Sequence, residues 1–198
     1  MIAKQAKVLN DTQVKAVHSF LLSTRNAKRD VVVFLLSVKA GLRAKEIAAL
    51  QWRMVMTPDG KVGQTINLPN QASKGQSGRV IPINKTLHTA LLDLYLDEVQ
   101  SKHFDADEAF VVRTERSRST TPQVIVNMFA NWYRRLGLIG CSSHSGRRSF
   151  VTNAAKKISL AGGSLRDVML LVGHKSLSTT QRYIEYDTDA QRRVVDMI

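Results

Sequence analysis

Six residues of types that can act on a phosphodiester are spread along the chain. They are two arginines, a lysine, two histidines and a tyrosine, namely Arg43, Lys74, His144, Arg147, His174 and Tyr183. Arginine presents a rigid fork of donors that matches phosphate oxygens. Tyrosine is a weak nucleophile at neutral pH, so it needs a proton acceptor and a polarised phosphate before it attacks. These residue types together fit phosphoryl transfer to a protein nucleophile.

Each of these residues also has an ordinary structural interpretation. Arg43 could pair with Glu46 three residues on, and a loop lysine such as Lys74 is usually only solvated. His174 follows a glycine and could cap a helix end, while Tyr183 could be a half-buried core aromatic. The order of the whole set along the chain is what favours chemistry.

That order resembles the tyrosine recombinase, or phage integrase-like, family from about residue 9 to residue 187. The family pattern is a G-[LM]-R-x-x-E box, a hairpin lysine, an H-x-x-R box, an L-G-H box, and a tyrosine nine residues after that histidine. In this sequence they stand as Gly41-Leu42-Arg43 with Glu46, Lys74, His144 with Arg147, Val172-Gly173-His174, and Tyr183. The segment GHKSLSTTQRY is the most specific piece of the match.

One box departs from the family's usual H-x-L-R-H. It reads His144-Ser145-Gly146-Arg147-Arg148, so a glycine replaces the apolar residue and an arginine replaces the second histidine. Either arginine could then seem eligible for the site. The three-residue step from His144 selects Arg147.

Three residues are assigned to the scissile phosphate, and a fourth to their support, by this resemblance and by the chemistry of their side chains. Arg43 and Arg147 would hold the non-bridging oxygens and stabilise the charge of the pentavalent state. His174 would donate a hydrogen bond to the same phosphate. Glu46 would support Arg43 rather than react.

Three residues are assigned to bond making and proton transfer. Tyr183 would attack phosphorus, and His144 would take its proton or donate to a phosphate oxygen. The resemblance implies that Lys74 protonates the departing 5′-oxygen. The product would be a 3′-phosphotyrosyl link that conserves the phosphodiester energy, so no cofactor is expected. The histidines show no metal-ligand spacing, so no metal is expected.

Two nearby residues offer alternative nucleophiles. Tyr186 lies three residues after Tyr183, but the nine-residue interval from His174 favours Tyr183. Cys141 with His144 superficially looks like a Cys–His pair. That pair lacks an orienting partner, and a small packed thiol is the simpler interpretation.

The elements that must position these residues are mainly helical, so we expect an α+β class domain. The segment Val31–Ala40 is apolar nearly all round and predicts a central buried helix that ends at Gly41. Further helices are expected from Asn10 or Asp11, over Ala44–Gln51, Leu87–Val99, Pro122–Leu136 and Leu165–Leu171, from Ser143 or Ser145 to about Ile158, from Ser176 or Ser178 through Tyr186, and over Ala190–Ile198. Three short strands, Trp52–Met56, Gln64–Leu68 and Arg79–Ile83, predict a small antiparallel sheet in the N-terminal third.

The charge is strongly positive and unevenly placed. The 198 residues carry 29 Lys+Arg against 16 Asp+Glu, a formal net charge of +13. Residues 93–108 hold six acids, whereas residues 113–148 hold seven arginines and one acid. An excess of this size suggests a polyanionic partner, most often nucleic acid and less often an anionic membrane. Together with the family resemblance, it leads us to expect double-stranded DNA as the partner. Besides the catalytic Arg147, six arginines are candidates for flanking phosphate contacts: Arg113, Arg116, Arg118, Arg134, Arg135 and Arg148.

Length and composition exclude several classes of protein. The chain suits one domain, and we expect residues 1–198 to be a single catalytic domain without the N-terminal core-binding domain of many family members. No apolar run reaches 18 residues, no secretory signal is recognisable, and the one cysteine, Cys141, excludes an internal disulfide framework. A cytoplasmic, nucleoid-associated protein without a membrane is therefore expected.

The resemblance further implies self-association into a synaptic tetramer on DNA, with accessory DNA-binding proteins as further candidates. Two other functions stay open at this point. One is a DNA-binding regulator or remnant without turnover. The other is DNA relaxation of the type IB topoisomerase kind, which uses the same residue types.

Overall fold

The computed structural model describes residues 6–72, 78–100, 104–114, 117–183 and 195–196, and they form a mainly helical fold with one small sheet. The helices are α1 (Asp11–Leu22), α2 (Ala27–Ala40), α3 (Ala44–Ala49), α4 (Lys85–Glu98), α5 (Pro122–Arg135), α6 (Ser145–Lys157), α7 (Leu165–Val172) and α8 (Leu177–Gln181). Short 3-10 turns are η1 (Trp52–Met54), η2 (Asn70–Ala72) and η3 (Ser159–Ala161), and the strands are β1 (Thr65–Leu68) and β2 (Arg79–Pro82). The expected α+β class with a predominance of helix is confirmed.

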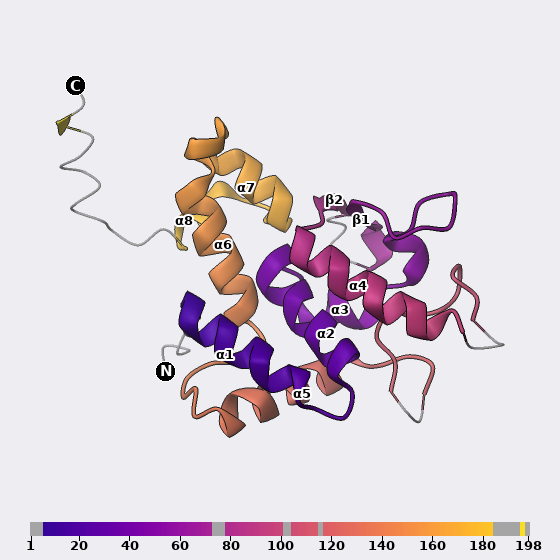
Figure 1. Cartoon of the computed structure of the whole chain (residues 1–198). Helices are drawn as coiled ribbons and strands as arrows, with labels where there is room; N and C mark the ends of the chain where they lie inside the picture. The colour runs from indigo at the N-terminus through magenta and orange to yellow at the C-terminus, as the bar shows by residue number, and fades with distance from the viewer. Residues whose placement is uncertain (1–5, 73–77, 101–103, 115–116, 184–194, 197–198) are drawn as a thin grey trace.

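Helix α2 is the centre of the fold. Ten of its residues, Asp30 among them, are buried, and α1, α3, α4 and α6 all pack against it (Figure 1). A helix that is apolar nearly all round can remove its apolar side chains from water only if every face of the helix is buried. The expectation of a central buried helix is confirmed, and the helix begins at Ala27, four residues earlier than predicted.

Local signals set most helix ends. The Asn10 side chain accepts the N–H of the third residue of α1 at 2.8 Å, and Thr121 caps α5 in front of Pro122. Gly41 and Gly173 end α2 and α7 in the left-handed conformation, with φ of 66° and 65°. Residues with a side chain rarely adopt this conformation. Both glycines come directly before segments that carry site residues.

The sheet has two strands instead of the three that were expected. The segments Gln64–Leu68 and Arg79–Ile83 form β1 and β2, which pair antiparallel with Thr65 opposite Pro82. The prediction of a strand over Trp52–Met56 was wrong. Its first residues form the 3-10 turn η1, and only an isolated bridge at Met56 has strand-like pairing.

The backbone of η1 is occupied by another part of the chain. The N–H of Trp52 donates to the carbonyl of Ala109 and that of Arg53 to the carbonyl of Ala106, each at 3.0 Å. These donors therefore do not face β1. Trp52, Met54 and Val55 are buried, so the apolar residues of this segment reach the core from a turn instead of from a strand.

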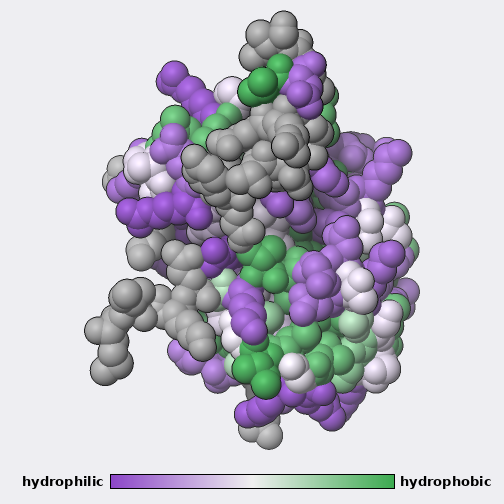
Figure 2. Space-filling model, turned by 90° about the vertical axis from the view of Figure 1, so that its left-hand side faces the viewer, coloured by the Kyte–Doolittle hydropathy of each residue, from purple (hydrophilic) through white to green (hydrophobic). Residues whose placement is uncertain are grey.

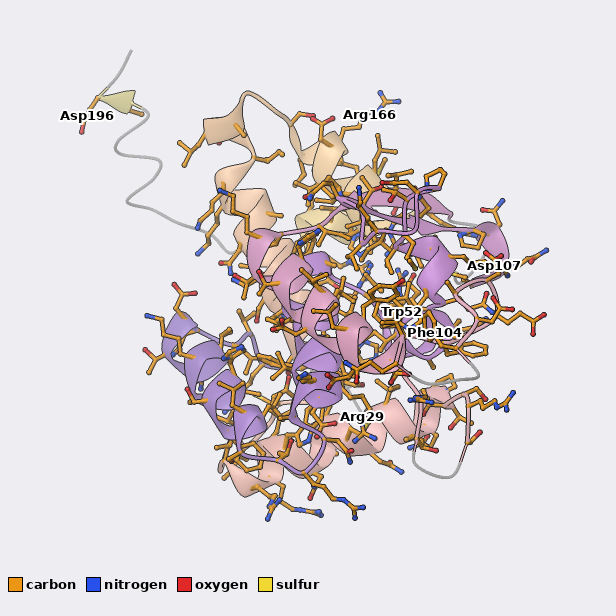
Figure 3. The ribbon with its side chains drawn as sticks, turned by 45° about the vertical axis from the view of Figure 1, so that its right-hand side comes forward. Arg29, Trp52, Phe104, Asp107, Arg166 and Asp196 are labelled. Carbon is orange, nitrogen blue, oxygen red and sulfur yellow. The ribbon has the colours of Figure 1, made fainter. Side chains whose placement is uncertain are left out.

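Trp52 is the centre of an aromatic cluster that fixes this turn. Its ring lies 5.3 Å from Tyr95 of α4 and 6.4 Å from Phe104, both in edge-to-face arrangements. Figure 3 shows Trp52 and Phe104 near each other beside the end of α4. Edge-to-face pairs of this kind add to the stability that area burial provides.

A second, smaller core joins α6, α7 and α8. Val151, Val168 and Val172 are fully buried there, and Phe150 and Tyr183 pack against them. In Figure 1 these three helices lie together at one end of the molecule, and α5 lies at the other end. Helix α8 ends at Gln181, and the next two residues, Arg182 and Tyr183, form a turn instead of the predicted continuation of the helix. The rest of that continuation, residues 184–186, lies outside the described residues, as does most of the expected helix over 190–198.

The molecular surface on the side of α1 and α6 is mostly hydrophilic, with smaller hydrophobic areas between the polar side chains (Figure 2). Within the described part of the chain, no helix has the length and apolar character needed to cross a membrane.

Candidate active site

The structure brings together five of the six residues singled out for chemistry, and they come from four separate places in the fold. Arg43 lies between α2 and α3, His144 and Arg147 lie at the start of α6, His174 follows α7, and Tyr183 follows α8. The sixth, Lys74, lies outside the described residues, as does the alternative nucleophile Tyr186.

A cleft of about 340 Å³ marks where these elements meet. His144, Arg147, Arg148 and Tyr183 line it, together with Ala6 from the N-terminal segment. His144 caps α6 and is exposed to solvent. A polyanion could therefore reach the histidine, the arginines and the tyrosine from one side.

Arg43 is held at the start of α3 by Glu46. The Glu46 carboxylate accepts the Arg43 backbone N–H at 2.8 Å and the Nη1 group of its side chain at 2.9 Å. The Arg43 side chain is 23% exposed, whereas that of Glu46 is fully buried. The expected support of Arg43 by Glu46 is thus a pair of direct bonds, one to the main chain and one to the guanidinium.

Arg79, a residue that sequence reasoning did not assign to the site, shares the same carboxylate. Its Nη1 and Nη2 donate to the two oxygens of Glu46 at 3.0 and 3.1 Å, and its Nε donates to the carbonyl of Leu171 at 3.0 Å. Burial by itself would raise the pKa of Glu46. The hydrogen bonds and charges of Arg79 and Arg43 outweigh that effect, so the pKa lies below its ordinary value.

Arg147 is buried beneath the cleft. Its Nη1 donates to the carbonyl of Gly41, and its Nη2 donates to the carbonyl of Val172 at 2.8 Å. Desolvation, with help from the positive charges of Arg43 and Arg79, lowers the pKa of Arg147 to about 9. A guanidinium that is buried beside like charges gains from any phosphate brought to it.

His174 lies at the rim of the second core. Its Nδ1 forms a 2.9 Å hydrogen bond with the buried hydroxyl of Thr180, and its ring stacks on Tyr183. Burial, and then the charges of Arg147, Arg43 and Arg79, lower the pKa of His174 to about 4. The imidazole is therefore neutral at pH 7, and only one of its two nitrogens carries a proton.

Tyr183 is fixed through its backbone and its ring. Its carbonyl accepts the Thr152 hydroxyl at 3.3 Å, and its ring packs on the second core. The guanidinium carbon of Arg148 lies 6.0 Å from the centre of the ring. Arg148 also donates to the carbonyl of Ala6 at 3.0 Å, so it connects the N-terminal segment with the tyrosine.

Gly146 has a packing reason that the sequence did not reveal. A Cβ atom at this position would lie 2.5 Å from the Ser37 hydroxyl and 2.8 Å from a methyl carbon of Val38, both on α2. The glycine lets α6 approach the central helix closely. This explains physically why the box that carries Arg147 has no apolar side chain at its third position.

The proposed flanking arginines do not gather at the cleft. Arg148 alone lines it among those described, while Arg116 lies outside the described residues. Arg134 and Arg135 lie in the last turn of α5, at the far end from α7 and α8 (Figure 1). Arg134 donates to Asn131, and Arg135 lies over the ring of Phe20.

The other two flanking arginines lie beside acidic side chains. Arg113 pairs with Glu98 at 2.7 Å and borders a hollow of about 650 Å³, larger than the cleft but away from Tyr183. Arg118 is exposed and borders a neighbouring hollow together with Glu108. Size alone therefore does not identify the site, because none of the five described residues singled out for chemistry lines the larger hollow.

Arg79 could have been found from one weak signal. It is the first residue of the second strand and stands two positions before the buried Ile81, so a basic residue shares the inward face of the strand. A buried arginine needs a carboxylate partner. The sequence offers several acids, and only the tertiary structure identifies Glu46.

Comparison with known proteins finds a family and sequence relatives for this chain. The sequence model of the phage integrase family matches residues 7–189. The tyrosine recombinase XerA of Pyrococcus horikoshii is 28% identical over 191 residues, which cover 96% of this chain and 60% of the relative. The tyrosine recombinase XerD of Listeria monocytogenes is 31% identical over 183 residues, which cover 89% of this chain and 57% of the relative.

Solved structures share the fold. An integrase of the transposon Tn1549, in complex with a circular intermediate DNA, superposes with a TM-score of 0.75 at 16% identity and covers 100% of this chain and 67% of that one. A crystal structure of XerA recombinase gives 0.73 at 18% identity, with 96% and 64% covered. The chain spans about three fifths of the length of the curated relatives.

Proposed function

The chain belongs to the phage integrase family, and from that membership we propose that it is the catalytic part of a recombinase that cuts and rejoins double-stranded DNA through Tyr183. The observation that carries the proposal is the convergence at one cleft of Tyr183, His144 and Arg147, with Arg43 and His174 beside them. These residues are separated by up to 140 positions in sequence. A reaction at a single phosphate would use all of these side chains together.

The first step moves one phosphodiester from DNA to protein. The Tyr183 oxygen forms a bond to phosphorus, the bond from phosphorus to the 5′-oxygen breaks, and the phenol loses its proton. We assign that proton to His144, which is exposed at the same cleft. The departing 5′-oxygen takes up a proton, for which Lys74 is the candidate. One ester is exchanged for another, so rejoining is the same step in reverse.

Arg43 and Arg147 are proposed to hold the non-bridging oxygens. Each terminal nitrogen of Arg147 carries two N–H groups, and one carbonyl bond each leaves a second N–H for phosphate. Because its carbonyl partners fix the guanidinium before substrate arrives, little reorganisation is needed when charge develops in the transition state.

His174 is proposed as a neutral donor to the phosphate. A neutral imidazole donates through one nitrogen only, so Nε2 can donate only when Nδ1 accepts the Thr180 hydroxyl. The 2.9 Å bond to Thr180 suits that arrangement. The stacking of His174 on Tyr183 places donor and nucleophile on the same side of the site.

The wider assembly is also a proposal. A DNA-acting enzyme of this kind would work in the cytoplasm in association with the nucleoid, and strand exchange would require several copies, consistent with a synaptic tetramer and accessory proteins. Residues 1–198 would be the catalytic domain of each copy in that assembly. Arg113, Arg116, Arg118, Arg134, Arg135 and Arg148 would contribute to its phosphate contacts.

A covalent trapping experiment tests the function. The protein is incubated with nicked duplexes that carry a randomised central segment, and protein-linked DNA is isolated under denaturing conditions and sequenced. We expect a covalent adduct at a defined sequence, lost in Tyr183→Phe and retained in Tyr186→Phe, which is the matched control.

The other outcomes separate the competing functions. Sequence-specific binding without any adduct favours a DNA-binding regulator. Relaxation of supercoiled plasmid without strand exchange favours a topoisomerase-like activity. If Tyr183→Phe forms adduct at the rate of the unchanged protein, the nucleophile assignment is wrong.

A further inference from the structure

We propose that Arg79 is a positioning residue that fixes Arg43 and His174 relative to each other by tying α3 to the end of α7. The inference rests on the proposed function, because it concerns how the phosphate-binding groups of that site are held. Arg79 belongs to neither the sequence motifs nor the lining of the cleft, and its role follows from its contacts.

The first observation is that Arg79 joins three elements. It begins β2, its two terminal nitrogens donate to Glu46 of α3, and its Nε donates to the Leu171 carbonyl in the last turn of α7. Its side chain is only 6% exposed. A guanidinium buried to that degree is not on the surface that DNA would touch, so its effect must pass through its partners.

The contact with Glu46 acts on Arg43. One carboxylate is shared, and each of its two oxygens accepts one hydrogen bond from Arg43 and one from Arg79. If Arg43, which is partly exposed, were the only partner of the fully buried Glu46 carboxylate, their ion pair would offset little of the hydration that the carboxylate loses on burial. Arg79 supplies the buried countercharge and leaves the Arg43 side chain oriented toward solvent, where a phosphate can meet it.

The contact with Leu171 acts on His174. Arg79 and Arg147 donate to successive carbonyls, those of Leu171 and Val172, at the C-terminal end of α7. Two cations at a helix C-terminus stabilise it and satisfy carbonyls that lack a helical partner. The chain then turns at Gly173 directly into His174, so this anchor sets where the imidazole begins.

Gly173 shows how closely Arg79 approaches this turn. A Cβ atom on Gly173 would lie 2.9 Å from the Nη1 atom of Arg79. A glycine at position 173 therefore leaves room for the Arg79 side chain. It also suits the left-handed φ of 65° at this position. The same guanidinium thus contacts the carboxylate that holds Arg43 and also lies against the turn that leads into His174.

The experiment compares Arg79→Gln and Arg79→Lys with Arg53→Gln. Arg53 is exposed on η1 and bonds Gln51, so its change removes the same charge at a distance from the cleft. Adduct formation is measured under single-turnover conditions on a nicked duplex recovered by trapping, and DNA binding is measured at the same salt. We expect adduct formation about 100-fold slower in Arg79→Gln, because small displacements of positioned groups have effects of that order.

DNA affinity separates positioning from loss of direct binding to DNA. We expect the affinity of Arg79→Gln to match that of Arg53→Gln, since Arg79 is buried and both changes remove one charge. Arg79→Lys keeps the charge beside Glu46 but lacks the fork that reaches both oxygens and Leu171. We expect its adduct rate to fall between those of the unchanged protein and Arg79→Gln.

The pH profile supplies a readout that a purely structural role would not move. Glu46 faces Arg43 on its own element, Arg79 on β2 and the charge of Arg147 on α6. Loss of Arg79 removes a cause of the lowered pKa of Glu46, so the carboxyl gains a proton at higher pH. The adduct rate of Arg79→Gln should then decline on the acid side at higher pH than that of the unchanged protein, and Glu46→Gln should lack this extra decline.

Thermal unfolding by circular dichroism is recorded for every variant. The proposal is overturned if Arg79→Gln forms adduct at the rate of Arg53→Gln, or if the unfolded fraction at the assay temperature accounts for the loss in both Arg79 variants. A failure of the unchanged protein to form any adduct is a different result, because it rejects the proposed function instead.

Discussion

The imidazole of His174 stacks on the ring of Tyr183, with the ring centres 5.5 Å apart and the planes inclined by 25°. The nine-residue interval between them contains a turn and the short helix α8, and the chain folds back over this interval so that Tyr183 lies beside His174. The proposed hydrogen-bond donor to the phosphate and the proposed nucleophile are thereby joined within one segment. Their relationship makes the protonation of His174 the most direct probe of the site.

We expect His174 to titrate near pH 4. Desolvation and the neighbouring arginines lower its pKa from the ordinary 6.5 to about 4. Between these values the unfolded chain binds more protons than the folded one, so folding stability falls as pH falls through this window. The slope from this one group is at most about 1.4 kcal/mol per pH unit, and less because the ring is only partly buried.

NMR titration of the imidazole resonances measures the midpoint directly. Denaturant unfolding between pH 6.5 and 4 measures the linked stability, and His174→Gln should give a flatter dependence over that interval. A midpoint near 6.5 for His174 would contradict the burial and charge effects inferred from the fold.

We expect Thr180→Val to slow adduct formation about tenfold. The change removes the hydroxyl that bonds Nδ1 of His174 at 2.9 Å and keeps the shape of the side chain. Loss of one partner of a buried hydrogen bond costs on the order of 1–2 kcal/mol. The nitrogen-15 shifts of His174 should then show a changed tautomer population.

Thr89→Val on the exposed side of α4 is the control for this substitution. An unaltered tautomer population in Thr180→Val, combined with an unaltered rate, would show that Thr180 does not orient the imidazole.

We expect Gly146→Ala to destabilise the fold by about 1–3 kcal/mol through overpacking. The added methyl group would lie 2.5 Å from the Ser37 hydroxyl, on the face where α6 meets α2. Adding Ser37→Ala to this variant should restore part of the lost stability, because it removes the hydroxyl oxygen that lies nearest to the added methyl group.

Chemical denaturation measures these stabilities. Gly60→Asn is the control, since Gly60 has nothing within 4 Å of an added Cβ and asparagine tolerates its φ of 77°. Equal losses from the two glycine substitutions would mean that backbone conformation, and not the α2–α6 contact, determines the cost.

We expect Arg118→Gln to reduce the dependence of DNA affinity on salt. Removal of one bond to a phosphate group should change the slope of log affinity against log salt by roughly 1. Arg118 is exposed, whereas Arg113 already pairs with Glu98 through both carboxylate oxygens, so Arg113→Gln should have the smaller effect.

Affinity measured across a salt series distinguishes these cases, with Arg53→Gln as the reference for loss of an exposed charge from a residue that lines neither hollow. A larger change of slope for Arg113→Gln than for Arg118→Gln would indicate that the Glu98 pair opens on DNA binding.

Much of the fold could be predicted because local rules decide it. The all-round apolar character of residues 31–40 placed α2 in the centre, and Gly41 and Gly173 marked helix ends where φ must be positive. The strand predicted over Trp52–Met56 was wrong because a buried turn can hold the same apolar residues as a short strand. Its hydrogen-bond donors face residues 106 and 109, a pairing that no local pattern contains.

The sequence by itself determined the inventory of reactive side chains, because residue type and spacing are properties of the chain. The tertiary structure alone decided how those side chains are held. Arg79 and Glu46 are 33 positions apart, and Gly146 and Ser37 are 109 apart, yet each pair meets within bonding or contact distance. Hydrogen bonding and close packing act over a few ångströms, so long-range contacts of this kind exist only after the chain has folded.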